Sequence, residues 1–172
     1  MEPPTLPVMD AATRSRLDRM HARDTVLEVR HLGKTFESAQ GPVEAIRDLS
    51  FSVRRREFLS VVGASGCGKS TLVRILAGLE TATSGEVLVD GKPVSGPGRD
   101  RGMVFQGYTL FPWLTVERNV AFGLEMAGTG QQTALVHARE WIDLVGLRGF
   151  ESKYPHQLSG GQKQRVMIAM AL

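Results

Sequence analysis

The stretch from Phe58 to Gly78, FLSVVGASGCGKSTLVRILAG, constrains the fold more than any other part of this 172-residue chain. The apolar run at 58–62 predicts a short buried strand, and the glycines that follow predict a tight loop. The apolar spacing after the loop predicts a helix that ends at Gly78. Residues 63–70 match G-x-x-x-x-G-K-[ST], and a strand before it and a helix after it are the context that this phosphate-binding motif requires.

The residue types of the loop suit a bound phosphate. Backbone N–H groups can surround an anion only where side chains do not crowd them, and the following helix adds its own free N–H groups. Lys69 is placed to reach the β- and γ-phosphates, the Ser70 hydroxyl can bind Mg²⁺, and Thr71 can donate to an α-phosphate oxygen. The alternative is a glycine-rich turn with an exposed lysine. The predicted phosphate-binding residues are Gly63, Ala64, Ser65, Gly66, Cys67, Gly68, Lys69, Ser70 and Thr71.

Composition excludes several classes of protein. A hydrophobic share of 42% and a charged share of 23% are typical of one globular domain with a core. The net charge is +3, and the cationic run Arg54–Arg56 lies between strand-like segments, which favours a solvated turn over a nucleic-acid surface. No nucleic-acid partner is expected. Cys67 is the single cysteine, which excludes an internal disulfide and is typical of a reducing compartment; we interpret it as a small tolerated residue, with a redox or alkylation switch as the alternative.

The segments before and after the phosphate loop predict a small antiparallel sheet. Residues 1–24 mix prolines and charges without an apolar face, which predicts a disordered, removable tail. Alternating or apolar runs predict further strands, and Asp90-Gly91 is a strong turn signal. No apolar run approaches the ~18 residues of a membrane span and no signal peptide is visible, so we expect a cytosolic chain. The predicted strands are Thr25–Arg30, Val43–Ile46, Leu49–Val53, Gly85–Val89 and Gly102–Phe105, the last leading into Gln106.

The pattern changes to helix after Thr115. This threonine can cap a helix over VERNVAFGLEM, and Gln131–Val145 carries apolar residues at near-helical spacing. Two consecutive helices predict a helical insertion, which we place at about 110–165. A third helix follows LSGGQ at Leu158–Gln162, with apolar residues at Val166, Ile168 and Met170.

The two motifs together resemble the ATP-binding subunits of ABC transporters, with Gln106 at the position of the family's Q-loop glutamine. The resemblance covers about residues 25–172. It implies an α/β fold, a P-loop NTPase core of the ABC ATPase type with an N-terminal antiparallel β subdomain and a helical insertion. A flexible linker before a core helix is the alternative interpretation of LSGGQ.

The resemblance also implies how ATP and Mg²⁺ are bound. In the family two ATPase domains pair head to tail, here as a homodimer or with a paired subunit, and each ATP lies between the phosphate loop of one domain and the signature of the other. Gln106 would reach Mg²⁺ or the attacking water, so Lys69 and Gln106 are the implied catalytic residues. Phe36 matches the aromatic residue that stacks on adenine, with a core phenylalanine as the alternative. The implied signature contacts are Ser159, Gly160, Gly161 and Gln162.

The segment Thr109–Met126 resembles the subunits of nitrate, sulfonate and taurine importers. Phe111, Pro112 and Trp113 place bulky apolar side chains in a loop, which predicts a docking surface; burial of Trp113 in the core is the alternative. The resemblance implies a membrane permease that docks near Gln106–Val116. It further implies a periplasmic or extracellular solute-binding protein as an indirect partner and a location on the inner face of the cell membrane. Other importer classes share this loop and stay open.

The family continues from the signature helix into a strand that ends in Asp-Glu, and a later histidine contacts the γ-phosphate. None of these lies in the 172 residues, so we expect this chain, as an incomplete domain, to hydrolyse ATP poorly on its own. Arg56, where the family usually has glycine, and Met170 are smaller departures. Three other interpretations stay open: a non-hydrolysing regulatory ABC protein, a soluble ABC ATPase of DNA repair or translation, and a different P-loop enzyme such as a small-molecule kinase.

Overall fold

The computed structural model describes residues 10–15 and 22–172. Most of the predicted tail, residues 1–9 and 16–21, lies outside the described residues, and residues 11–15 are helical. The chain divides into two compact units, Met1–Arg101 and Gly102–Leu172. None of the helices among the described residues is both long and apolar enough to span a membrane.

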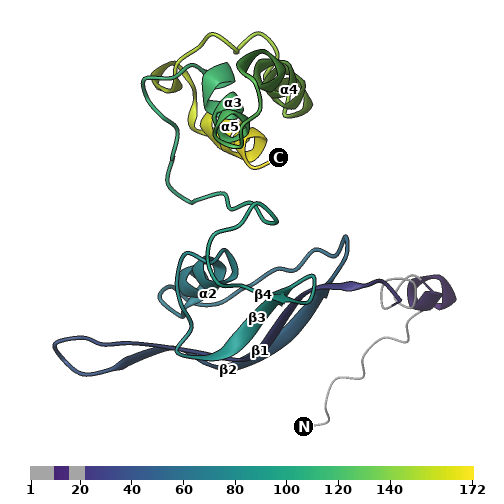
Figure 1. The fold of residues 1–172 in the computed structure, drawn as a ribbon. Coiled ribbons are helices and arrows are strands. Elements are labelled where there is room, and N and C mark those ends of the chain that lie inside the picture. Colours follow the sequence, from purple (N-terminus) through teal and green to yellow (C-terminus); the bar gives the residue numbers. More distant parts are fainter. Residues whose placement is uncertain (1–9, 16–21) are drawn as a thin grey trace. The chain divides into compact units, whose positions relative to one another are not determined.

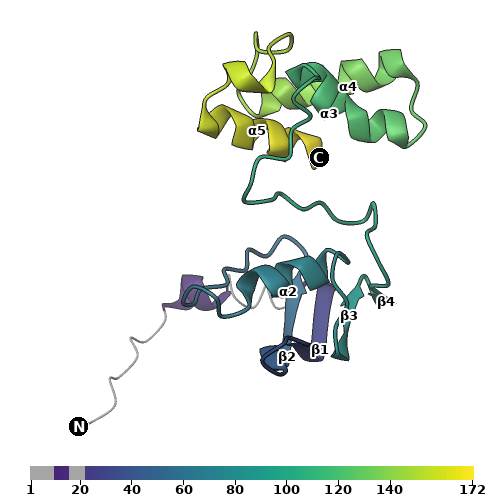
Figure 2. The same cartoon turned by 90° about the vertical axis from the view of Figure 1, so that its left-hand side faces the viewer.

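The first unit is a four-stranded antiparallel sheet with one helix on it (Figure 1). Its strands are β1 (Thr25–Phe36), β2 (Val43–Arg54), β3 (Ser84–Val89) and β4 (Lys92–Pro93), in the spatial order β2-β1-β3-β4. Helix α2 (Lys69–Leu76) lies along one face of the sheet, as Figure 2 shows. The core of this unit is the cluster of buried residues Val29, Leu32, Ile46, Leu72, Ile75 and Val87.

The first two strands are longer than predicted. The segments Val43–Ile46 and Leu49–Val53 are parts of one strand. Asp48, at the predicted turn between them, takes a left-handed conformation (φ 44°), and the hydrogen-bond ladder continues past it. The register of the β1–β2 pair contains a bulge: Lys34 pairs with Ile46, whereas Thr35 pairs with Glu44. Ala45 is therefore the extra residue of β2.

Two predicted strands are absent from the described structure, and these predictions were wrong. Residues 58–62 have no strand assignment, and the side chains of Phe58 and Val62 are 92% and 89% exposed. Residues 102–105 have none either. A run of this kind becomes a buried strand only when neighbours complete its hydrogen-bond ladder, and no described segment pairs with either run.

The second unit is helical. It contains α3 (Val116–Met126), α4 (Gln131–Leu144), a 3-10 turn at Pro155–Gln157 and α5 (Gly160–Met170). Thr115 caps α3 as predicted, since its hydroxyl accepts a bond of 3.3 Å from the Arg118 N–H. The predicted apolar face of α5 was partly wrong, because Ile168 is 45% exposed and the core takes Val166, Met167 and Ala169. Positions 166, 168 and 170 follow the period of a strand, whereas a helix buries residues three or four apart.

Candidate nucleotide-binding site

The phosphate loop closes around the ammonium group of Lys69. Its Nζ donates to the carbonyl oxygens of Gly63 (2.8 Å) and Ala64 (2.6 Å). Gly66 and Gly68 have φ angles of 80° and 91°, a left-handed region in which glycine is favoured. A methyl group on Gly63 would come within 2.7 Å of the Cys67 sulfur. Side chains at Gly63 and Gly68 would therefore collide with neighbouring atoms, whereas Gly66 is required by its backbone conformation rather than by lack of space.

Helix α2 points its free N–H groups at this loop. The Leu72 N–H makes the first bond of the helix, to the Gly68 carbonyl at 2.9 Å, so the N–H groups of Lys69, Ser70 and Thr71 have no acceptor within the helix. These N–H groups and the positive end of the helix dipole favour an anion. The buried Leu72 side chain packs α2 into the core of the first unit, whereas Ser70 is exposed. The donor set fits a polyphosphate, and the Ser70 hydroxyl fits one coordination position of Mg²⁺.

The bulge in β2 joins this loop to the predicted adenine-stacking residue. A methyl group on Gly68 would overlap the carbonyl oxygen of Ala45, the extra residue of the bulge. Ala45 is two residues from Val43, the strand partner of Phe36. Phe36 of β1 therefore pairs with β2 only two residues away from the residue on which Gly68 of the phosphate loop packs. Phe36 is 36% exposed, which disfavours its interpretation as a core residue.

The signature segment forms a capped helix start. The Ser159 hydroxyl accepts from the Gln162 N–H (3.4 Å), and the Gln162 side chain accepts from the Ser159 N–H (2.8 Å). This capping box fixes the first turn of α5, while Gly160 and Gly161 are exposed. The cap uses the side-chain oxygen of Gln162, so the NH2 group of this side chain and the backbone N–H groups of the first turn are the donors that this turn offers to a ligand.

Sequence reasoning missed Tyr108, which contacts the signature. A methyl group on Gly160 would meet the Tyr108 hydroxyl at 2.6 Å, and the Lys163 Nζ lies 5.3 Å from the centre of the tyrosine ring. An aromatic residue two positions after the predicted glutamine was the available signal. Gln106 itself is exposed and belongs to the helical unit together with the signature. The predicted site residues thus form two groups, one in each unit.

The loop before α3 presents an exposed tryptophan. The Phe111 ring packs on Phe122, with ring centres 4.5 Å apart, and its backbone is held by the fully buried Asn119. Trp113 beside it is 70% exposed, so the interpretation of Trp113 as a core residue was wrong. A large apolar side chain held out on a rigid loop is typical of a contact surface.

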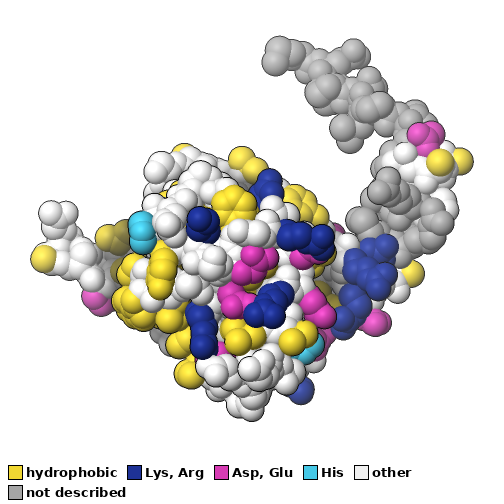
Figure 3. Space-filling view, turned by 90° about the horizontal axis from the view of Figure 1, so that it is seen from above, with side chains coloured by type: hydrophobic (Ala, Val, Ile, Leu, Met, Phe, Trp, Pro, Cys, Tyr) yellow, Lys and Arg dark blue, Asp and Glu magenta, His cyan; other side chains and the backbone are white. Residues whose placement is uncertain are grey.

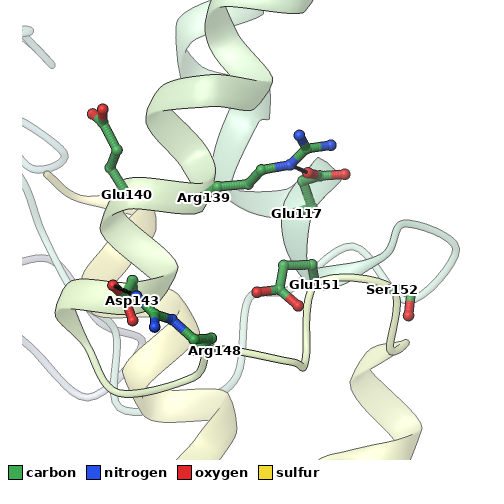
Figure 4. A pocket seen from close by; sticks show the side chains of 7 residues that line it. All are labelled: Glu117, Arg139, Glu140, Asp143, Arg148, Glu151 and Ser152. Atoms are coloured by element: carbon green, nitrogen blue, oxygen red, sulfur yellow. Dashed lines mark hydrogen bonds and ion pairs between the residues drawn. The ribbon is translucent and has the colours of Figure 1, made fainter.

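A shallow cavity of about 640 Å³ in the helical unit does not suit a nucleotide. Figure 4 shows Arg139 paired with Glu117 and Arg148 paired with Asp143, at 2.5 Å for the second pair. Figure 3 shows acidic and basic side chains interspersed on the face that it presents. Both arginines are already neutralised, and four of the seven lining residues are acidic, which disfavours a triphosphate. The lining residues are Glu117, Arg139, Glu140, Asp143, Arg148, Glu151 and Ser152.

Comparison with known proteins assigns the family. A family model described as ABC transporter matches residues 46–172. The chain belongs to the ABC transporter family. The matched region includes the phosphate loop, Gln106 and the signature, and it leaves out Phe36 and β1.

Relatives and solved structures of ABC proteins extend the match over most of the chain. This chain is 52% identical to an uncharacterised ABC transporter ATP-binding protein of Methanocaldococcus jannaschii, and the match covers 90% of this chain and 57% of that protein. It is 51% identical to the nitrate import ATP-binding protein NrtD of Synechocystis (85% and 55%) and 50% identical to the taurine import ATP-binding protein TauB of Burkholderia pseudomallei (80% and 53%). The chain therefore spans a little over half the length of these relatives.

The fold is that of an ABC ATPase cassette. A solved dimeric structure of an ATP-binding cassette, in a post-hydrolysis state with ADP and Pi bound, superposes with a TM-score of 0.77 at 33% identity. The match covers 85% of this chain and 68% of that chain. The predicted P-loop ABC fold class, with its antiparallel sheet and its helices, is confirmed.

Proposed function

We propose that this chain is the nucleotide-binding part of an ABC ATPase subunit that powers the import of a small solute through a separate permease. The observation that carries the proposal is the phosphate loop, wound around Lys69 and joined through the bulge at Ala45 to the exposed ring of Phe36. The similarity to nitrate and taurine import proteins supports a solute of the nitrate, sulfonate or taurine kind.

The residues of the first unit bind the nucleotide. Phe36 stacks on adenine, the N–H groups of the loop and of the first turn of α2 surround the β-phosphate, and Lys69 extends to the γ-phosphate. Ser70 of this unit and Gln106 of the second unit would hold Mg²⁺, which would supply positive charge to the phosphate oxygens. Gln106 also orients the attacking water, so it and Lys69 are the catalytic residues of this chain.

The residues of the second unit bind the nucleotide of a second copy. Ser159, Gly160, Gly161 and Gln162 open α5 with a fixed first turn, whose N–H groups face the γ-phosphate held by the partner. ATP therefore joins two copies head to tail, and hydrolysis releases them. On this proposal residues 25–172 belong to one nucleotide-binding domain with a helical subdomain at about 110–165, and the tail 1–24 is dispensable.

The permease docks on the loop around Trp113, within Gln106–Val116. This side chain is 70% exposed, and the fully buried Asn119 fixes the loop that carries it. The chain then acts on the cytoplasmic face of the membrane, and a periplasmic or extracellular solute-binding protein delivers the solute to the permease. No nucleic acid takes part.

Nucleotide binding is tested with Mg-ATP and the full chain in equilibrium dialysis. We expect Lys69→Ala to weaken ATP binding roughly 10-fold to 100-fold, because it removes charge-assisted bonds to phosphate. Lys92→Ala is the matched control, since this lysine is exposed in β4. Equal ATP affinity of the Lys69→Ala variant and the unaltered chain would refute the nucleotide site.

Docking is tested by co-purification of the full chain with a co-expressed permease subunit of a nitrate, sulfonate or taurine importer. We expect Trp113→Ala to abolish co-purification while ATP affinity stays unchanged. Leu144→Ala is the matched control, because Leu144 is 73% exposed at the end of α4. Retention of the permease by the Trp113→Ala variant would exclude this loop as the docking surface. Absence of any membrane partner would favour a soluble ABC ATPase instead.

A further inference from the structure

We infer that Lys34 is a positioning residue that holds the ring of Phe36 for adenine. This inference rests on the proposed nucleotide function. Lys34 and Phe36 are two residues apart on β1, so their side chains leave the same face of the strand. The Lys34 Nζ lies over the Phe36 ring, 4.7 Å from its centre.

The ammonium group of Lys34 is held in place from two other sides. Its Nζ donates to Glu80 Oε1 at 2.7 Å and to the Thr81 carbonyl at 2.8 Å. The side chain is only 10% exposed, which is rare for a lysine and is tolerated because the charge is paired and hydrogen-bonded. The hydrogen bond from Lys34 also lowers the pKa of the Glu80 carboxyl, which favours its charged form. A lysine fixed in this way does not act as a mobile surface charge.

The position of the cation determines which face of the ring a base can use. A cation over an aromatic face is attracted by the ring quadrupole, which restrains the ring. Lys34 covers one face and Phe36 is nevertheless 36% exposed, so on this inference a base stacks on the opposite face. Adenine, Phe36 and Lys34 would then form three layers.

The same pair ties the ring to the phosphate loop. Glu80 follows α2, whose first residue is Lys69, while Gly68 at the other end of the helix packs on Ala45 in the bulge. Both ends of α2 are therefore fixed to the β1–β2 pair within a few residues of Phe36. This arrangement sets the distance between the Phe36 ring and the phosphate loop before nucleotide binds.

The test compares ATP with inorganic tripolyphosphate, both with Mg²⁺, by calorimetric titration of the full chain. We expect Lys34→Met to weaken ATP binding roughly threefold to tenfold, as for loss of a cation over an aromatic ring, and to change tripolyphosphate binding less than twofold. In a Phe36→Leu background, Lys34→Met should have no further effect on ATP binding. Lys92→Met is the matched control for the loss of one positive charge from the sheet.

Three results would overturn the inference. If Phe36→Leu weakens ATP binding but Lys34→Met does not, Lys34 has no positioning role and the nucleotide function stands. If neither variant affects ATP binding, the adenine role of Phe36 fails and the inference fails with it. If Lys34→Met weakens tripolyphosphate binding as much as ATP binding, Lys34 stabilises the whole first unit and does not specifically position the Phe36 ring. Should the single variant fail to fold by circular dichroism, Lys34→Met/Glu80→Met removes both charges, and the same selective loss of ATP binding is expected.

Discussion

Replacement of the buried Asn119 should strongly destabilise the helical unit. Its side chain is fully buried, accepts from the Phe111 N–H at 2.8 Å and donates to the carbonyl oxygens of Phe111 (3.2 Å), Leu114 (3.0 Å) and Thr115 (2.9 Å). Two of these carbonyls keep another bond, because Phe111 also accepts from the Leu114 N–H and Thr115 from the Asn119 N–H. Asn119→Ala thus leaves chiefly the Phe111 N–H and the Leu114 carbonyl without their partner.

The cost follows from these two groups. A buried polar group without a partner costs about 1–3 kcal/mol, so we expect Asn119→Ala to lower the free energy of unfolding of this unit by about 3 kcal/mol. With a urea m-value of about 1 kcal/mol/M for a small unit, the midpoint of urea unfolding should fall by about 3 M.

Intrinsic fluorescence measures this unit selectively, because both tryptophans of the chain, Trp113 and Trp141, belong to it. Gln132→Ala is the control, since this side chain is exposed on α4 and should leave the midpoint unchanged. A shift of the urea midpoint by less than about 0.5 M for Asn119→Ala would refute the reasoning. It would mean that water forms hydrogen bonds with the backbone groups of the loop as well as the Asn119 amide does.

Three further predictions concern both units. Gly68→Ala should destabilise the first unit by about 1–3 kcal/mol, because φ is 91° and the added methyl overlaps backbone; circular dichroism melting measures it, with Gly96→Ala, where no atom is near, as the control. Glu80 has a lowered pKa, so its pairing with a lysine stabilises the folded unit above the carboxyl's ordinary pKa, and this contribution is lost as the pH falls through the folded pKa. The melting temperature should therefore fall more steeply between about pH 5 and pH 3 for the unaltered chain than for the Glu80→Gln variant, and parallel curves would contradict this. Ser159→Ala removes a helix cap and should cost about 1 kcal/mol in tryptophan-detected unfolding, whereas an unchanged midpoint would show that the cap adds nothing.

Local signals predicted the helical unit well. The Thr115 cap, the helix from Val116 and the helix after LSGGQ all depend on residues a few positions apart, which the sequence displays directly. The phosphate loop was predictable for the same reason. The apolar run at 58–62 was misread because a buried strand depends on neighbours that lie elsewhere in the chain.

Contacts between distant segments could not be predicted. The pairing of Lys34 with Glu80 joins residues 46 positions apart, and a methyl on Gly160 would meet Tyr108 across 52 positions. Neither pair has a spacing that marks it in a single sequence. The bulge at Ala45 was equally hidden, because it is defined by the register of β2 against β1.

Because of the bulge at Ala45, the connection and the strands of the β1–β2 hairpin should tolerate insertions and deletions differently. The connection at 37–42 lies outside both strands and ends in exposed residues, so chain can be added there without moving either strand. Deletion of Ala45 would instead remove the bulge between the pairs Lys34–Ile46 and Thr35–Glu44, and with it the backbone carbonyl on which Gly68 of the phosphate loop packs. Length variation in this hairpin should therefore be confined to its tip.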